Sequence, residues 1–216
     1  MDINKSRQEF IDRIALRSAV NAATQTRSKK FHVFAESITI KTSDTTEETK
    51  RKRTEKIEVI QFWKTKLKEY AVKYEEKRDD EFFIKDVVAF QKEFEAFNNK
   101  FEGEGIRIAQ CQKSLSVYLK WLWCLGHLNN EPPMCPIDRN VLNACYKNLD
   151  KKADKEERKL IQKVNRDGGW GQINDLDEYK GLVNIVKKVA GTQSPAVWEL
   201  SLFNVILQEE KDESDS

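Results

Sequence analysis

Residues 106–125 form the segment that most constrains the fold of this chain. Apolar residues recur there at three- and four-residue spacing, as on one face of a helix: Ile108, Cys111, Leu115, Leu119 and Leu122. Four bulky residues between them extend the apolar surface almost all the way round: Val117, Tyr118, Trp121 and Trp123. Such a helix must be covered by other elements. The sequence therefore predicts a central helix that is the most buried element of the protein.

Further helices are predicted around it by shorter periodic segments and by helix caps. They cover about residues 6–26, 54–77, 138–149 and 195–208, and two more begin at Asp154 and Asp175, each followed three residues later by Glu as in a capping box. Gly191 is expected to stop the second of these, and Ser194-Pro195 to start the last helix. The fold class is mainly α, a single compact multi-helix domain.

A stripe of aromatic residues follows the second long helical segment. Phe90, Phe94, Phe97 and Phe101 are spaced by four, three and four residues. Burying one phenylalanine stabilises a fold by about 2–3 kcal/mol. The stripe therefore predicts a packing seam of the core.

Two segments are less regular. Residues 31–40 alternate apolar and polar side chains well enough for a short strand or hairpin, and residues 42–49 are polar, as in a loop. Residues 209–216 hold five acidic residues against one lysine, and we expect a disordered acidic tail after a single domain formed by residues 1–208.

Charge is distributed unevenly along a chain whose formal net charge is only +2. Residues 1–56 carry 13 Lys and Arg against eight Asp and Glu. This basic region includes the run Lys50, Arg51, Lys52 and Arg53, which could attract phosphates or could simply be a solvated surface. No apolar stretch approaches the ~20 residues needed to cross a bilayer, so we expect no membrane association and a cytoplasmic location.

Four cysteines, Cys111, Cys124, Cys135 and Cys145, lie in apolar surroundings, which favours buried thiols over a disulfide framework. Cys124 and His127, with the two later cysteines, supply ligand types that zinc accepts, but the spacing does not match a zinc module. No nucleotide-binding glycine loop is present. We therefore predict neither a metal site nor a cofactor.

The most motif-like stretch joins a glycine turn to a later aspartate. Gly103 and Gly105 allow a tight turn at the start of the central helix, where backbone N–H groups can face a phosphate. Asp138 begins the next helix and could face a sugar during bond cleavage. The alternative for Asp138 is an ordinary N-cap, worth about 1 kcal/mol.

These residues resemble the helix-hairpin-helix DNA glycosylases, especially the oxidised-guanine branch. Gly103-x-Gly105-x-Arg107 is similar to the family's hairpin, and Pro136-Ile137-Asp138-x-Asn140-Val141 is similar to the segment that brings in its catalytic aspartate. The resemblance covers residues 103–145. It implies an all-helical DNA N-glycosylase that takes a damaged base out of the stack, with Asp138 stabilising the positive charge that develops on the sugar.

The family's lysine nucleophile falls at Arg107, whose guanidinium stays protonated and cannot form the covalent sugar adduct. Lys120 is the substitute that we consider, with an exposed helical lysine beside Trp121 as the alternative. Under the same resemblance, DNA or another nucleic acid is the expected partner. It would be bound at the glycine turn (Gly103, Gly105 and Arg107) and by basic residues of the amino-terminal region, namely Arg27, Lys29, Lys30, Lys50, Arg51, Lys52 and Arg53.

A non-catalytic interaction or regulatory scaffold protein is the competing interpretation. In it the central helix serves only as core, and exposed aromatic residues such as Trp170 hold a protein partner. The sequence leaves open both the choice between these functions and the oligomeric state.

Overall fold

The computed structural model describes residues 3–25 and 32–214, with side chains for residues 9–25 and 32–204. The described residues form eight α-helices: α1 (Ile3–Thr24), α2 (Thr46–Val72), α3 (Asp80–Lys92), α4 (Ile108–Cys124), α5 (Arg139–Asn148), α6 (Lys155–Arg166), α7 (Leu176–Ala190) and α8 (Pro195–Ser214). Three short 3-10 helices lie between them: η1 (Glu36–Ile38), η2 (Glu95–Lys100) and η3 (Trp170–Gln172). The mainly α fold is confirmed.

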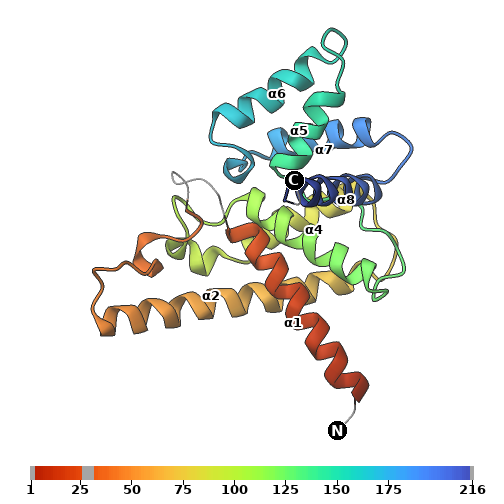
Figure 1. The fold of residues 1–216 in the computed structure, drawn as a ribbon. Helices are drawn as coiled ribbons and strands as arrows, with labels where there is room; N and C mark the ends of the chain where they lie inside the picture. Colours follow the sequence, from red (N-terminus) through yellow and green to blue (C-terminus); the bar gives the residue numbers. More distant parts are fainter. Residues whose placement is uncertain (1–2, 26–31, 215–216) are drawn as a thin grey trace.

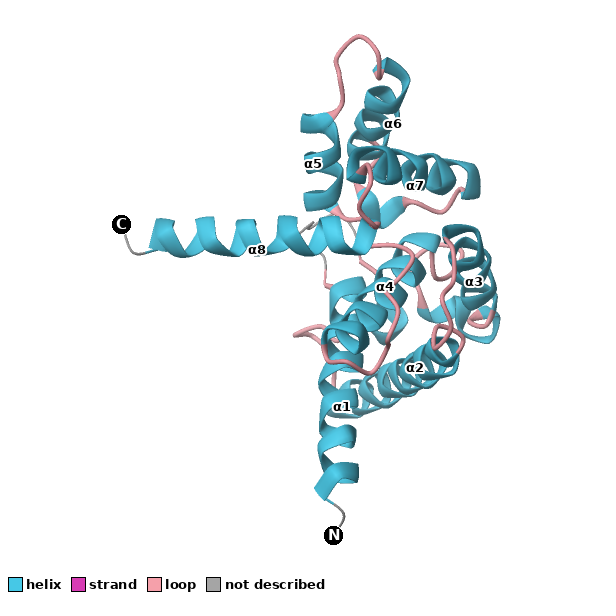
Figure 2. Ribbon diagram, turned by 90° about the vertical axis from the view of Figure 1, so that its right-hand side faces the viewer, coloured by secondary structure: helices cyan, strands magenta, loops and turns pink. Residues whose placement is uncertain are grey.

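Helix α4 is the centre of the larger group of helices. It packs against α1, α2 and α3, while α5, α6 and α7 form a second group on the other side, as Figure 1 shows. More than half of the residues of α4 are buried, a larger share than in any other helix whose side chains are described throughout. This confirms the prediction from its nearly continuous apolar surface. Helix α8 packs against α7 and then runs outward from the body (Figure 2).

Aromatic side chains fill the space beside α4. Phe90, Phe94 and Phe101 are buried, and Phe94 makes edge contacts with Phe90, Phe101 and Trp63 at ring-centroid distances of 5.5, 5.7 and 5.3 Å. Trp63 is fully buried, and its indole N–H donates to Ser114 Oγ on α4 at 3.0 Å. The predicted seam is confirmed as core, although α3 ends at Lys92 and the later phenylalanines lie beyond it.

The start of one helix and the cap of another differ from the prediction. Helix α2 begins at Thr46, inside the segment predicted as a loop, since Thr45 and Glu48 form a capping box. Asp154 does not cap α6: its Oδ2 accepts from Asp150 N–H at 2.8 Å and its Oδ1 pairs with Lys188 Nζ at 2.6 Å.

The signals at both ends of α7 and at the start of α8 were predicted correctly, whereas α2 ends at Val72 and not near residue 77. Asp175 caps α7 by accepting from Glu178 N–H at 2.7 Å, and Gly191 ends that helix at a φ of 65°. Ser194 Oγ accepts from Val197 N–H at the start of α8. The backbone of α8 is helical to Ser214, over residues for which the composition predicts a disordered tail.

Residues 32–40 contain no strand beyond one antiparallel bridge between Phe34 and Phe101. Ala35 N–H donates to Lys100 C=O and Glu102 N–H donates to Val33 C=O, after which the chain turns into η1. The bridge ties this segment to the loop that precedes α4; Phe31 lies outside the described residues. Within the part of the chain that the structure describes, no helix is both long and apolar enough to cross a bilayer.

Candidate functional site

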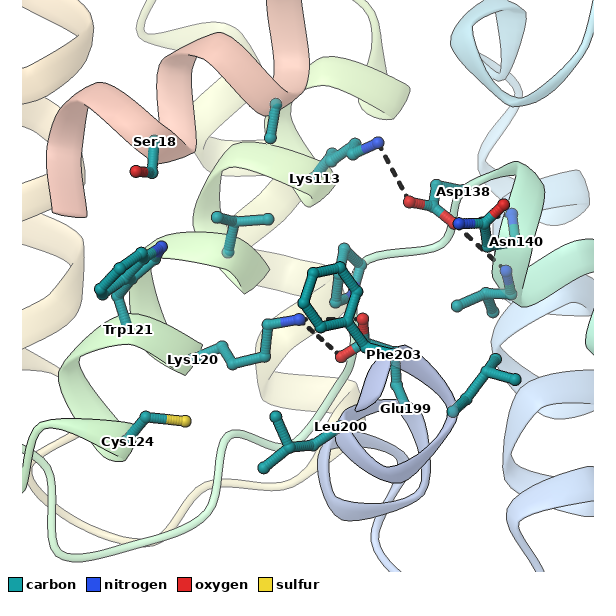
Figure 3. A pocket seen from close by; sticks show the side chains of 15 residues that line it. Ser18, Lys113, Lys120, Trp121, Cys124, Asp138, Asn140, Glu199, Leu200 and Phe203 are labelled. Atoms are coloured by element: carbon teal, nitrogen blue, oxygen red, sulfur yellow. Dashed lines mark hydrogen bonds and ion pairs between the residues drawn. The ribbon is translucent and has the colours of Figure 1, made fainter. Parts of the chain in front are cut away.

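A cavity of about 490 Å³ lies between α1, α4, α8 and the start of α5. Helix α4 supplies the largest share of its wall, and α8 covers one side (Figure 3). Most of the lining is apolar, with four charged side chains: Lys113, Lys120, Asp138 and Glu199. Asp138 and Lys120, the two catalytic candidates from the sequence, therefore line the same cavity.

Lys113 and Asp138 form the first charged pair. Lys113 Nζ lies 3.1 Å from Asp138 Oδ2, and the two side chains are 14% and 24% exposed. Figure 3 shows the lysine reaching from α4 toward the carboxylate at the start of α5. The segment before Asp138 is fixed to α4, because Gln112 exchanges two hydrogen bonds with the backbone of Ile137, at 2.9 and 3.0 Å. The distance between this lysine and aspartate is thus set by buried contacts.

Asp138 is also the N-cap of α5. Its Oδ1 accepts from the backbone N–H groups of Asn140 and Val141, at 2.9 and 3.2 Å, which leaves Oδ2 for Lys113. The prediction that Asp138 is an N-cap is therefore correct, but capping uses only one of its two carboxylate oxygens. The second oxygen faces a cation in the cavity wall.

Lys120 and Glu199 form the second pair, between α4 and α8. Lys120 Nζ lies 2.8 and 2.7 Å from the two carboxylate oxygens, and its side chain is only 17% exposed. The interpretation of Lys120 as an exposed surface lysine is thus wrong, because the side chain points inward to pair with the Glu199 carboxylate. Burial raises the pKa of Glu199 above its ordinary value, and the charge of Lys120 offsets this only in part.

Aromatic and sulfur groups complete the wall near Lys120. The ring of Phe203 on α8 is 44% exposed, and Lys120 Nζ lies 5.2 Å from its centroid. Trp121 and Cys124 line the α4 side (Figure 3). An apolar lining with a few fixed polar groups is typical of a small-molecule site.

The glycine turn does not share this cavity. Gly105 and Arg107 line a separate hollow of about 260 Å³ at the start of α4. The first amides of α4 are already bonded within the chain, since Ile108 N–H donates to Asn174 Oδ1 and Ala109 N–H to Ile173 C=O. The expected phosphate site at this helix start is therefore occupied by the chain itself. Gly103 and Gly105 adopt φ values of 78° and 130°. Because other residues rarely adopt such values, the backbone turn by itself explains why glycine stands at these two positions.

The basic run of the amino-terminal region lies on α2, away from the cavity. In Figure 1 the start of α2 is at the left edge, whereas α5 and α8 are at the other side of α4. Lys52 is buried in an ion pair with Asp44 at 2.8 Å, and Arg51 pairs with Glu55 at 2.7 Å. Lys52 cannot serve as an exposed phosphate contact; Lys50 and Arg53 are exposed. Arg27, Lys29 and Lys30 lie outside the described residues.

Trp170, the four cysteines and a metal site are the remaining candidates that the sequence raised. Trp170 is half-buried against the core with Lys113 Nζ 4.2 Å from its ring centroid, so it is not presented outward to a partner. All four cysteines are free thiols; Cys111, Cys135 and Cys145 are buried, which raises the pKa of each thiol, whereas Cys124 is exposed, contrary to the prediction. Among the described residues, no three His, Cys, Asp or Glu side chains gather as metal ligands.

Sequence reasoning missed Lys113 and Glu199. Lys113 lies seven residues before Lys120 on the same face of α4, and that helical spacing was the signal that could have found it. Glu199 offered no comparable signal, because its partner is 79 residues away. No family model, curated protein or solved structure matches this chain.

Proposed function

We propose that this protein is a DNA base-excision N-glycosylase whose active site is the cavity between α1, α4, α5 and α8. The observation that carries the proposal is the 3.1 Å contact between Lys113 Nζ and Asp138 Oδ2 in the cavity wall. The resemblance of residues 103–145 to glycosylases calls for a lysine beside the aspartate. Lys113 supplies it, in place of Arg107 and of Lys120.

The dimensions and lining of the cavity suit an extruded nucleoside. A volume of about 490 Å³ lies within the range of roughly 300–1,000 Å³ usual for ligand pockets. Trp121 and Phe203 offer aromatic faces for a base, and the charged pairs offer hydrogen bonds to its edge and to the sugar. One end of such a substrate would face Lys113 and Asp138.

The chemistry follows from the charges of the pair. The Lys113 ammonium donates a proton to the departing base as the glycosidic C1′–N bond breaks, and the electron pair of that bond leaves with the base. The ionised Asp138 offsets the positive charge left on the sugar. The neutral Lys113 amine then forms a bond to C1′. The nitrogen of this adduct then loses a proton, which O4′ takes up as the C1′–O4′ bond breaks, and the adduct becomes a protonated imine.

The test is covalent trapping. Duplex DNA with a single 8-oxoguanine opposite cytosine, and a second duplex with an abasic site, are incubated with the full-length protein and sodium borohydride. The imine would be reduced to a protein–DNA crosslink that survives denaturing electrophoresis. We expect crosslinking by the parent protein and at least a ~100-fold loss in Lys113→Gln and in Asp138→Asn, as for groups that act directly on the reacting atoms.

Lys77→Gln is the matched control, because Lys77 is exposed and lies outside the cavity. It should crosslink at the parent rate. Asp138→Asn keeps a good N-cap residue, so a folded Asp138→Asn protein that releases the base as fast as the parent would contradict the catalytic assignment. We also propose a cytoplasmic location, because a reducing compartment suits the four free thiols.

A second candidate function is a non-catalytic scaffold that binds a protein through apolar side chains. The observation in its favour is the exposure of Phe10 on α1, at 60%, and of Phe203 on α8, at 44%. Both belong to helices that project from the body (Figure 2). If this candidate is right, the Phe10→Ser and Phe203→Ser variants should lose a partner that co-purifies with the parent at a fixed ratio. Neither the parent protein nor the Lys113→Gln and Lys77→Gln variants should crosslink DNA.

A further inference from the structure

We propose that Trp170 is a positioning residue for Lys113, and that its ring helps to hold the Lys113 ammonium beside the Asp138 carboxylate. The role of Lys113 in bond formation rests on the proposed function, whereas the contact itself does not. The ring of Trp170 thus acts on the reaction through the lysine rather than by touching the substrate.

The ammonium of Lys113 has two partners from different parts of the chain. Asp138 Oδ2 lies at 3.1 Å and the centroid of the Trp170 ring at 4.2 Å. The lysine side chain is only 14% exposed. A flexible four-carbon stem would normally carry its charge out to water, so two partners are needed to keep the ammonium at the cavity wall.

The loop that carries Trp170 is built to fix the ring. Gly168 and Gly169 adopt φ values of 110° and 87°, a backbone conformation that other residues rarely reach. Gly169 N–H donates to Val164 C=O at 2.8 Å, which closes the loop onto the end of α6. These contacts set the position of Trp170 before any ligand binds.

The same loop is tied to α4 beside the lysine. The buried Gln110 donates from Nε2 to Gly171 C=O at 3.0 Å, and Gln110 lies one helical turn before Lys113. Helix α4 therefore fixes both the loop and the lysine, and the distance between the ring and the ammonium depends on a single rigid element.

Removing the ring should free the lysine without removing the carboxylate. A cation–π contact of this partly buried kind corresponds to roughly a three- to tenfold change in an equilibrium or rate. We expect Trp170→Leu to lower the rate of Lys113–DNA crosslinking by about three- to tenfold, and Trp170→Phe, which keeps an aromatic face, to restore most of it. The KM for DNA should change less than kcat, because the ring acts on the lysine.

A second measurement does not depend on DNA. The parent protein, Trp170→Leu and Trp170→Phe are treated with an acetylating reagent, and the acetylation rates of Lys113 and the exposed Lys77 are compared by mass spectrometry. Lys113 should react about three- to tenfold faster in Trp170→Leu than in the parent, relative to Lys77, once the ring no longer restrains and covers it. Trp123→Leu is the matched control, since Trp123 is a half-buried tryptophan of α4 that does not line the cavity.

The outcomes separate the two claims. Equal acetylation of Lys113 in the parent and in Trp170→Leu would overturn the positioning role. A selective increase in Trp170→Leu, absent from Trp123→Leu, would support it. If the increase is found and yet no protein crosslinks DNA, the contact stands and the glycosylase function falls.

Discussion

The start and the middle of α4 differ in what their polar groups do. At the start, Gly105 and Arg107 belong to a turn whose neighbouring amides are bonded to Asn174 and Ile173. About two and four turns further along, Lys113 and Lys120 face a cavity with carboxylates opposite them. The start resembles a motif, yet its groups are used up within the chain, whereas the middle has no motif and holds charged groups that line open space.

This difference teaches that a motif marks a required backbone shape before it marks a ligand site. A side chain at Gly105 would be strained, because the backbone φ is 130° and an added Cβ would force Asn98 Oδ1 to move. That requirement is sufficient to explain the glycine. The lysines of the cavity carry only a weak local signature, their seven-residue spacing, since a lysine on a helix is favourable in many surroundings.

The largest effect should come from comparing one substitution at a cavity lysine of α4 with one at the glycine turn before the helix. In the crosslinking assay Lys113→Gln should lose at least ~100-fold activity, while Arg107→Gln, at the start of the same helix, should stay within about threefold of the parent per folded molecule. Circular dichroism would check that both variants are folded. A stronger loss in Arg107→Gln than in Lys113→Gln would return the function to the glycine turn.

The next effect concerns stability at the turn. Gly105→Ala adds a side chain at a φ of 130° against Asn98, and we expect the free energy of unfolding to fall by roughly 2–4 kcal/mol. Gly126→Ala is the comparison, because Gly126 also has a positive φ, 76°, but no atom within 4 Å of its added Cβ. It should lose only about 1 kcal/mol. Urea denaturation measures both, and equal losses would show that the collision with Asn98 is relieved.

A smaller effect is expected at the N-cap of α5. Asp138→Ala removes the acceptor for Asn140 and Val141 N–H, and should cost about 1–2 kcal/mol of unfolding free energy. Asp138→Asn retains a capping side chain and loses only the ion pair with Lys113, so it should cost less than about 1 kcal/mol. Thermal unfolding of the two variants would test this; the same loss in both would mean that the ion pair, not the cap, supports the helix.

The smallest effect is a change of stability with pH at Glu199. Burial raises the pKa of this carboxyl in the folded protein above its ordinary value of 4.5, so the folded state holds the proton where the unfolded state has lost it. The resulting stability is complete below pH 4.5 and is lost as the pH rises through the folded pKa. Glu199→Gln cannot gain or lose this proton, so the stability of the parent relative to this variant should fall as the pH rises above 4.5. A rise over that range would mean that Lys120 lowers the pKa of Glu199 more than burial raises it.

Much of the fold was predictable because the signals of a helix, its apolar periodicity and its caps, lie within a few neighbouring residues. The apolar circumference of α4, the aromatic stripe and the caps at Asp175 and Ser194 each depend on residues a few positions apart. The early start of α2 was also readable, from Thr45 and Glu48, but was missed. Asp154 shows the limit: it has the residue pattern of a cap, and a lysine 34 positions away takes its carboxylate instead.

By itself the sequence determined that this protein is helical, that α4 is its centre, and that Asp138 begins a helix, since periodicity and capping act over one or two turns. Only the tertiary structure decided that Asp138 faces Lys113, that Lys120 points inward to Glu199, and that Trp170 covers a lysine. These contacts join residues 25, 79 and 57 positions apart. The physical reason is that an ion pair or a cation–π contact depends on distance in space and leaves no periodic trace along the chain.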